Sequence, residues 1–122
     1  MKYCQSLGFD VEYGASRLGD YDLDINNKKF EIKMATEDQG GNFQFNHLRY
    51  DYKYHFVLCL GVSPDSILFK IYSKADLATG KAGSLVSMGR GQNSSFKLTK
   101  PKSTLMNIDL LGETLTSLFA EE

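Results

Sequence analysis

The sequence predicts one mixed α/β domain spanning residues 1–122. Three observations carry this prediction: apolar and acidic residues alternate over residues 21–25, a continuous apolar run covers residues 54–61, and apolar residues recur at helical spacing near the C-terminus. The first two patterns are typical of a half-buried strand and a fully buried strand, and the third of an amphipathic helix. A chain of 122 residues buries roughly two-thirds of its unfolded surface, which is enough for one core.

The clearest pattern is a β-hairpin over residues 21–35. Apolar residues alternate with aspartates in the first strand, and the two asparagines at positions 26–27 fit a tight turn because asparagine tolerates positive φ. In the returning strand, over residues 29–35, Glu31 and Lys33 share one face and the apolar residues take the other. We therefore expect the apolar residues of both strands to face the core, and the charged residues to lie on the opposite side.

The remaining segments are expected to form further helices and strands joined by polar loops. Short runs with Gly, Pro, Asn or Ser mark the loops, and an asparagine fits the N-cap of the last helix. The expected elements are, in chain order, a helix over residues 1–7 ending at Gly8, a loop over 14–19, a helix from Phe43 to about Tyr52 capped by Asn42, a strand over 54–61, a turn over 63–66, a strand over 67–72, a helical turn within 76–85, a loop over 89–95, and a final helix capped by Asn107 with Ile108, Leu111, Leu115 and Leu118 on its apolar face.

The composition excludes several classes of protein. The longest apolar runs are far shorter than the ~20 residues that cross a bilayer, and the N-terminal residues lack the apolar segment of a signal peptide. The two cysteines form neither a disulfide framework nor a zinc cluster. We therefore expect a soluble, cytoplasmic protein with no membrane partner and no small-molecule organic cofactor.

Histidine and cysteine side chains are weaker candidates for a site. His47 and His55 fall on different expected elements, and His55 flanks a buried strand, so a structural role is favoured over a metal site. Cys59 lies inside the apolar run, where a thiol behaves as a small hydrophobe rather than as a nucleophile.

Charges are distributed unevenly although the net charge is only −1. Residues 41–105 carry nine basic and three acidic residues, and no acid occurs between Asp76 and Asp109. A stretch of one sign beside an acid-rich one indicates a polyanionic partner. A solvated basic loop is the simpler alternative.

The charged face of the hairpin carries the groups needed for metal-assisted phosphodiester hydrolysis. Glu31 and Lys33 lie about 6.5–7 Å apart along their strand, and an aspartate of the facing strand, preferably Asp22, lies near them. Carboxylate oxygens suit Mg²⁺ or Mn²⁺, and a lysine beside them stabilises developing negative charge or positions a water. The alternative is a hairpin with cross-strand ion pairs. Three aspartates on one strand argue against it, because Asp is a poor strand former.

Residues 22–33, with the sequence DLDINNKKFEIK, resemble the Asp…(Asp/Glu)-x-Lys motif of the PD-(D/E)xK, or restriction-endonuclease-like, nuclease superfamily. The resemblance covers roughly residues 8–72. It implies an α/β fold in which a mixed β-sheet is flanked by helices, with an αβββαβ core. It also implies that residues 1–122 form a single nuclease-like domain.

The resemblance further implies a role for each residue of the motif. Asp22 and Glu31, with the main-chain oxygen of Ile32, would hold Mg²⁺, for which Mn²⁺ can substitute. Lys33 would orient the attacking water or neutralise charge on the phosphate. Gln44, in a Gln-x-x-x-Leu pattern expected on the following helix, would support Lys33 or the substrate.

The first acid of the motif has two alternatives. The family's proline before this acid is absent, since Tyr21 occupies that place, and Asp20 and Asp24 therefore remain alternatives to Asp22. Asp22 is preferred because its nine-residue offset from Glu31 suits a tight hairpin.

The function implied by the resemblance is a magnesium-dependent DNA endonuclease, of the restriction type or the nuclease domain of such an enzyme, acting on double-stranded DNA. Two alternatives are a catalytically inactive DNA-binding or protein-interaction domain on the same scaffold, and a structure-selective nuclease such as a Holliday junction resolvase. Whether the chain forms a homodimer is left open. The residues expected to contact DNA are Arg49, Lys53, Arg90, Asn93, Lys97 and Lys100.

Overall fold

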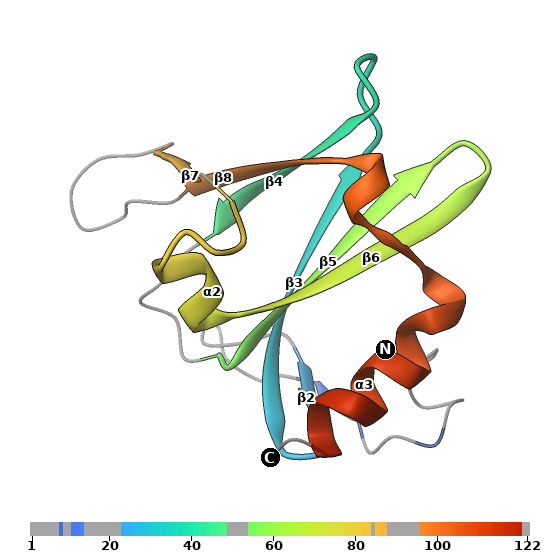
Figure 1. Ribbon diagram of the computed structural model, residues 1–122. Helices are drawn as coiled ribbons and strands as arrows, with labels where there is room; N and C mark the ends of the chain where they lie inside the picture. Colours follow the sequence, from blue (N-terminus) through green and yellow to red (C-terminus); the bar gives the residue numbers. More distant parts are fainter. Residues whose placement is uncertain are drawn as a thin grey trace.

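The computed structural model contains two β-sheets and a C-terminal helix (Figure 1). The structure describes Gly8, the backbone of residues 11–13, and residues 23–48, 54–83, 85–87 and 96–120, leaving aside the side chains of His47 and Ser87. The helices and strands are β1 (Val11–Tyr13), β2 (Leu23–Ile25), β3 (Lys28–Thr36), β4 (Asn42–Leu48), β5 (Phe56–Ser63), β6 (Ser66–Ser73), α2 (Lys74–Ala78), β7 (Leu85–Ser87), β8 (Phe96–Pro101), η2 (Lys102–Thr104), β9 (Met106–Asn107), η3 (Ile108–Leu110) and α3 (Leu111–Ala120).

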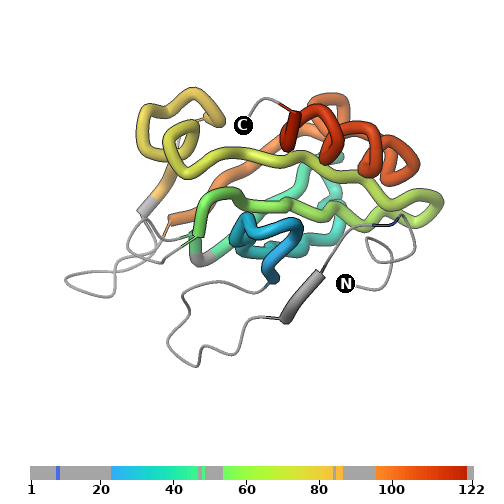
Figure 2. The backbone as a smooth tube through the Cα atoms, turned by 90° about the horizontal axis from the view of Figure 1, so that it is seen from below, coloured from blue at the N-terminus to red at the C-terminus, as the bar shows by residue number. Residues whose placement is uncertain are grey.

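A six-stranded sheet with strand order β1-β2-β3-β5-β6-β9 forms the centre of the molecule. β3 and β5 are parallel, and the other neighbouring pairs are antiparallel. A three-stranded antiparallel sheet, β4-β8-β7, packs against one face of this central sheet. The helix α3 packs against the other face (Figure 2). The arrangement is a mixed α/β fold, as predicted.

The predicted hairpin is present as β2 and β3. Asn26 and Asn27 have φ values of 49° and 70°. Two residues with positive φ in a two-residue loop are typical of a type I′ turn, whose twist matches that of the flanking strands. Leu23 pairs with Phe30 across the hairpin, and both side chains are buried in the cluster beneath α3.

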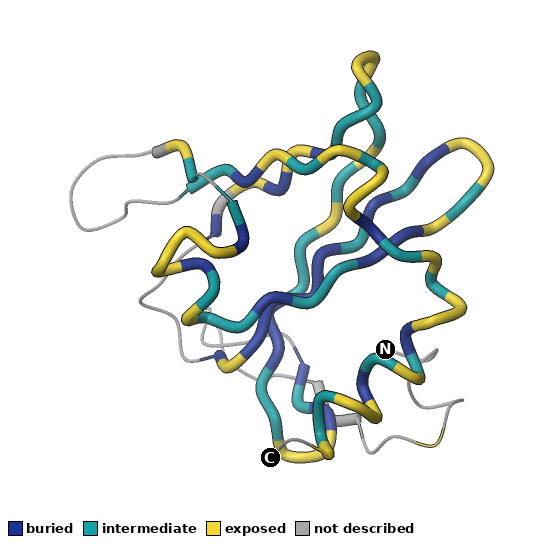
Figure 3. The backbone as a smooth tube through the Cα atoms, in the orientation of Figure 1, coloured by how far each residue is buried: buried dark blue, intermediate teal, exposed yellow. Residues whose placement is uncertain are grey.

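β5 is the central strand predicted from the apolar run, and it is covered on both faces (Figure 3). Phe56 and Leu58 pack on the side of α3, whereas Val57 and Cys59 pack on the side of the three-stranded sheet. Burial raises the pKa of the Cys59 thiol to about 12, so few molecules carry the reactive thiolate near neutral pH. The prediction that Cys59 is a core residue is confirmed.

His55, just before β5, joins this strand to the start of β3. Its backbone N–H donates a hydrogen bond to the carbonyl oxygen of Lys29 at 2.8 Å, and its Nδ1 accepts one from the backbone N–H of Lys29 at 2.9 Å. The predicted structural role of His55 is therefore confirmed.

The C-terminal helix begins where the sequence predicts. The side chain of Asn107 accepts a hydrogen bond from the backbone N–H of Asp109 at 2.9 Å, and the short helix η3 leads directly into α3. Leu111 and Leu115 are fully buried against the central sheet, and Leu118 packs partly against it. Apolar residues at helical spacing thus cover one face of the sheet.

The helix predicted over residues 43–52 is wrong, because β4 occupies the described part of this segment. Phe43 and Phe45 are fully buried, whereas Gln44 and Asn46 are exposed, and a period of two residues is that of a strand. The αβββαβ core is not confirmed, since in the described part of the chain a strand, rather than a helix, lies between β3 and β5.

The later connections follow the prediction in part. The turn between β5 and β6 lies at residues 64–65, as expected. The helical turn expected within residues 76–85 is α2, which begins earlier, at Lys74, because Ser73 and Asp76 form a capping box. None of the described helices is long and apolar enough to cross a membrane. Three segments with predicted structure lie outside the described residues: 1–7, 14–19 and 89–95.

Gly61 of β5 lies against an aromatic ring of the second sheet. A Cβ atom at this position would stand 2.9 Å from Cε1 of Phe43 and 3.0 Å from Cδ1 of Leu105. Because both neighbours belong to the core, Gly61→Ala is expected to lower the free energy of unfolding by about 1–3 kcal/mol. Urea unfolding measures this change.

Gly40→Ala is the matched control for this variant. A Cβ atom at Gly40 would stand 3.4 Å from its nearest neighbours, which is ordinary van der Waals contact. We expect its free energy of unfolding to stay within about 0.5 kcal/mol of the wild-type value. Equal stabilities for the Gly61→Ala and Gly40→Ala variants would contradict the close packing of the two sheets at Gly61.

Candidate active site

β3 carries two residues of the predicted site, Glu31 and Lys33. Their side chains share a face because they lie two positions apart in a strand. Their ladder partners on β5 are Val57 and Cys59, which pack in the core cluster formed with the three-stranded sheet. The expectation that only the apolar face of the hairpin meets the core is therefore wrong, because core residues cover both faces of the central sheet.

Glu31 is a buried acid, with 7% of its surface exposed. An ionised carboxylate at this depth requires compensating charges and hydrogen bonds, because an ion loses several kcal/mol of hydration on burial. Lys33 lies on the same face, about 7 Å further along the strand. Buried acids with nearby cations are concentrated at functional sites, although structural ion pairs also produce them.

A second cation, Lys100 of β8, approaches the same region from the three-stranded sheet. The positive charges of Lys33 and Lys100 partly offset the effect of burial on the pKa of Cys59, so both lie near this thiol. The Nζ of Lys100 donates a hydrogen bond to the carbonyl oxygen of Ala82 at 2.8 Å and lies 6.0 Å from the ring centroid of Tyr72. Lys100 thus has structural contacts that sequence analysis missed, and its contact with DNA stays a prediction.

Of the three candidates for the first acid, the structure describes only Asp24. Asp20 and Asp22 lie outside the described residues. Asp24 stands opposite Lys29 in the β2–β3 ladder, and by alternation it lies on the same face as Glu31. An acid opposite a lysine across a ladder is the arrangement that the ion-pair interpretation of this strand predicts.

Oxygen atoms on this face are suited to a hard cation. In the described part of the chain, no three His, Cys, Asp or Glu side chains come close enough together to hold a metal ion. The described donors of the predicted site are the carboxylate of Glu31 and the main-chain oxygen of Ile32. Both are of the kind that Mg²⁺ and Mn²⁺ prefer, and Mg²⁺ is usually bound through one or two carboxylates together with waters.

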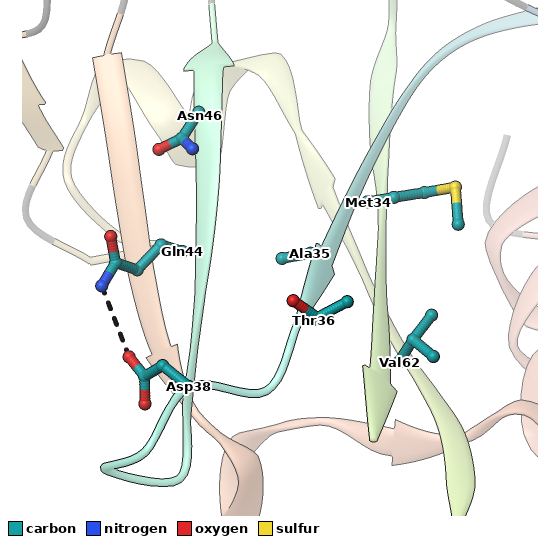
Figure 4. Close-up of a pocket in the computed structure, with 7 residues that line it drawn as sticks. All are labelled: Met34, Ala35, Thr36, Asp38, Gln44, Asn46 and Val62. Carbon is teal, nitrogen blue, oxygen red and sulfur yellow. Dashed lines mark hydrogen bonds between the residues drawn. The ribbon is translucent and has the colours of Figure 1, made fainter. Parts of the chain in front are cut away.

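Gln44 lies on the exposed face of β4 (Figure 4). Its Nε2 donates a hydrogen bond to Oδ2 of Asp38 at 3.3 Å. The other oxygen of Asp38 accepts hydrogen bonds from the backbone N–H groups of Gly40 and Asn42, each at 2.9 Å. These bonds, above all the one from Asn42, hold the pKa of Asp38 below its usual value. The support of Lys33 by Gln44 stays a prediction.

A concavity of about 550 Å³ opens beside Gln44, between the exposed face of β4 and the C-terminal end of β3 (Figure 4). Thr36 of β3 and the polar side chains of Asp38, Gln44 and Asn46 contribute to its lining. Sequence analysis missed Asn46 because it assigned this segment to a helix. The alternation of Phe and polar residues over residues 43–46 was the signal that could have identified it.

The residues predicted to contact DNA are only partly described. Lys97 and Lys100 both belong to β8 but fall on opposite faces of it, because they are three positions apart in a strand. Lys97 pairs with Val86, which is 57% exposed, and therefore lies on the outer face of the three-stranded sheet. Four other residues predicted to contact DNA lie outside the described part: Arg49, Lys53, Arg90 and Asn93.

The comparisons with known proteins give one structural likeness. No protein-family model matches the chain, and no curated protein matches it. Among solved structures, the fold is similar to that of a bacterial homing endonuclease, I-Ssp6803I, with a TM-score of 0.56 and 13% sequence identity, over 99% of this chain and 89% of that chain. The chain therefore shares the overall fold of this enzyme.

The lowered pKa of Asp38 predicts a pH dependence of stability. The ionised side chain accepts the turn's hydrogen bonds, so its stabilising effect is present above the pKa of the unfolded chain and is lost as the pH falls through the lower, folded pKa. Asp38→Asn removes the charge at nearly constant size. We expect this variant to be less stable than the wild type near neutral pH, and equally stable once both forms are uncharged in strong acid.

Urea unfolding of both proteins across the acidic range measures this difference. A stability difference between them that persists unchanged at pH values below the folded pKa would show that the charge of Asp38 is not its cause.

Proposed function

We propose that this chain is a metal-dependent endonuclease that hydrolyses phosphodiester bonds in double-stranded DNA. The fold shared with a homing endonuclease supports a nuclease and DNA as its substrate. The observation that carries the proposal is the burial of Glu31 on the same face as Lys33. An apolar pair would serve the core at least as well, so a role in chemistry accounts for these charges better than a role in stability.

The register of the hairpin supports Asp22 as the first acid. Leu23 pairs with Phe30 in the β2–β3 ladder. Asp22 directly precedes Leu23 in the sequence, whereas Asp24 stands opposite Lys29 in the ladder. The carboxylates of Asp22 and Glu31 would bind one cation together. Asp22 would thus supply a further ligand beside the described donors.

The proposed chemistry divides between the metal ligands and the lysine. Asp22, Glu31 and the main-chain oxygen of Ile32 would hold Mg²⁺, with Mn²⁺ able to replace it. The bound ion would supply a water of lowered pKa and polarise the scissile phosphate. Lys33 would orient the attacking water and neutralise the negative charge that develops on the phosphate oxygens. The proposed mode is restriction-type cleavage of the duplex.

Substitution at Lys33 or Glu31 tests this function. Because Lys33→Met removes the charge at similar length and Glu31→Gln removes a metal ligand, each should lower the rate of plasmid cleavage in Mg²⁺ by ~100-fold or more. Circular dichroism checks that each variant is folded, and binding to duplex DNA in Ca²⁺ provides a second measurement.

Lys70→Met is the matched control. Lys70 and Lys33 are the two ladder partners of Cys59, on β6 and β3 respectively, so both lysines lie on the same face of the sheet. Cleavage at the wild-type rate is expected for Lys70→Met. Full activity of Lys33→Met, or cleavage by the wild type in EDTA, would contradict the proposal and favour a scaffold that binds DNA without metal-dependent cleavage.

Calorimetric titration with Mn²⁺ tests which aspartate is the first acid. Asp22→Asn should abolish binding because a ligand is lost. Asp20→Asn and Asp24→Asn should weaken it only modestly, because each removes only a nearby negative charge. If Asp24→Asn alone abolishes binding, the register of the proposed site is wrong.

A further inference from the structure

The outer face of the three-stranded sheet presents hydrogen-bonding side chains to solvent. Gln44 and Asn46 alternate with buried phenylalanines on β4 and are exposed. Thr99 of β8 pairs with Gln44 and is also exposed, and Lys97 shares its face of β8. We refer to Gln44, Asn46, Lys97 and Thr99 as the amide face. The groups proposed for catalysis lie elsewhere, on β2 and β3.

The sheet that carries the amide face contains no acidic residue. Its strands, over residues 42–48, 85–87 and 96–101, include two lysines and no Asp or Glu. Asp38 lies at the rim, where its carboxylate accepts three hydrogen bonds from the chain. Neutral donors and acceptors beside a lysine suit a polyanion that is read by hydrogen bonds.

The shape of the amide face also suits a DNA duplex. β4 and β8 are neighbouring antiparallel strands of the three-stranded sheet, with an exposed outer face, and β-sheet proteins read DNA by placing strands in the major groove. Figure 4 shows that the side chains of Gln44 and Asn46 project from the same strand beside the concavity.

We propose that β4 and β8 enter the major groove of duplex DNA and that Gln44 and Asn46 read base edges there. This inference rests on the proposed function, from which it takes duplex DNA as the substrate. Asn and Gln side chains pair bidentately with N6 and N7 of adenine. Lys97, as a point charge, contacts a phosphate and positions the strand pair without reading sequence.

The composition of this surface favours DNA over a protein partner. Protein interfaces are centred on aromatic and apolar anchors. Among the described residues of this sheet, the exposed large hydrophobic residue is Val86, with 57% exposure, and it lies on the edge strand β7. In the groove it would contact a thymine methyl group.

The inference gives Gln44 a role different from the support of Lys33. Truncating a residue that reads a base lowers the sequence preference of the protein at one position. Truncating a residue that supports Lys33 lowers the cleavage rate of the protein and leaves its sequence preference unchanged. The two measurements therefore separate the roles.

The experiment selects bound sequences from a pool of duplexes with a randomised central block, using the full-length chain in Ca²⁺. We expect the wild type to enrich adenine at fixed positions. Gln44→Ala and Asn46→Ala should each reduce the preference at one position by roughly 5- to 150-fold. Lys97→Ala should instead weaken binding to all sequences alike and reduce the slope of log affinity against log salt by about one.

Gln39→Ala is the matched control, because Gln39 is an exposed glutamine of the β3–β4 turn outside the amide face. It should keep the wild-type preference. Unchanged preference in both Gln44→Ala and Asn46→Ala would overturn the inference, as would a lack of duplex binding by the wild type. If the wild type binds duplexes but does not cleave them in Mg²⁺, only the proposed function is contradicted. The sequence preferences of the Gln44→Ala and Asn46→Ala variants would still test this inference.

Discussion

The packing of Phe43 over Gly61 holds the two sheets together. Phe43 and Phe45 are stacked with ring centroids 6.4 Å apart, and Gly61 leaves the space that the ring of Phe43 fills. Protein interiors are close-packed, so the sheets can approach this closely only where one partner has no side chain. This contact fixes the direction of β4, with its aromatic rings turned inward and its amides turned outward.

The same packing determines the surroundings of Glu31 and Lys33. With a second sheet over the central one, these residues of β3 lie among core side chains, and Lys100 reaches the region from β8. Charges in such a setting interact more strongly than they do in water. Because burial also removes their hydration, such charges contribute little net stability. Under the proposed function they would provide the preorganised electrostatic environment that stabilises charge developing in the reaction.

Cleavage and sequence reading are proposed for neighbouring parts of one continuous segment. β3 carries the groups proposed for catalysis, β4 carries the amides, and residues 37–41 join them. The hydrogen bonds that Asp38 accepts from Gly40, Asn42 and Gln44 fix the path of this connection. Because contacts with phosphates position a duplex and contacts with bases specify it, this arrangement would tie the cut to the sequence that is read.

Elements whose signals are local could be predicted from the order of amino acids alone. The two asparagines set the β2–β3 turn because they accept positive φ, Asn107 sets the start of the last helix through its own side chain, and the apolar run identifies β5. The spacing of Glu31 and Lys33 also showed that they share a face, since alternation is a property of any strand.

Contacts between distant segments select a strand rather than a helix at β4, and they determine which faces of β3 and β8 are covered. β4 pairs with β8, a segment far along the chain, with Asn42 opposite Pro101. Residues 42–46 fit both a helix capped by Asn42 and a strand with alternating buried residues. Pairing with β8 makes this segment a strand. Burial of Glu31 and the opposite directions of Lys97 and Lys100 likewise depend on which segments meet. A local pattern cannot show this, because pairing between distant strands depends on the packing of the whole chain.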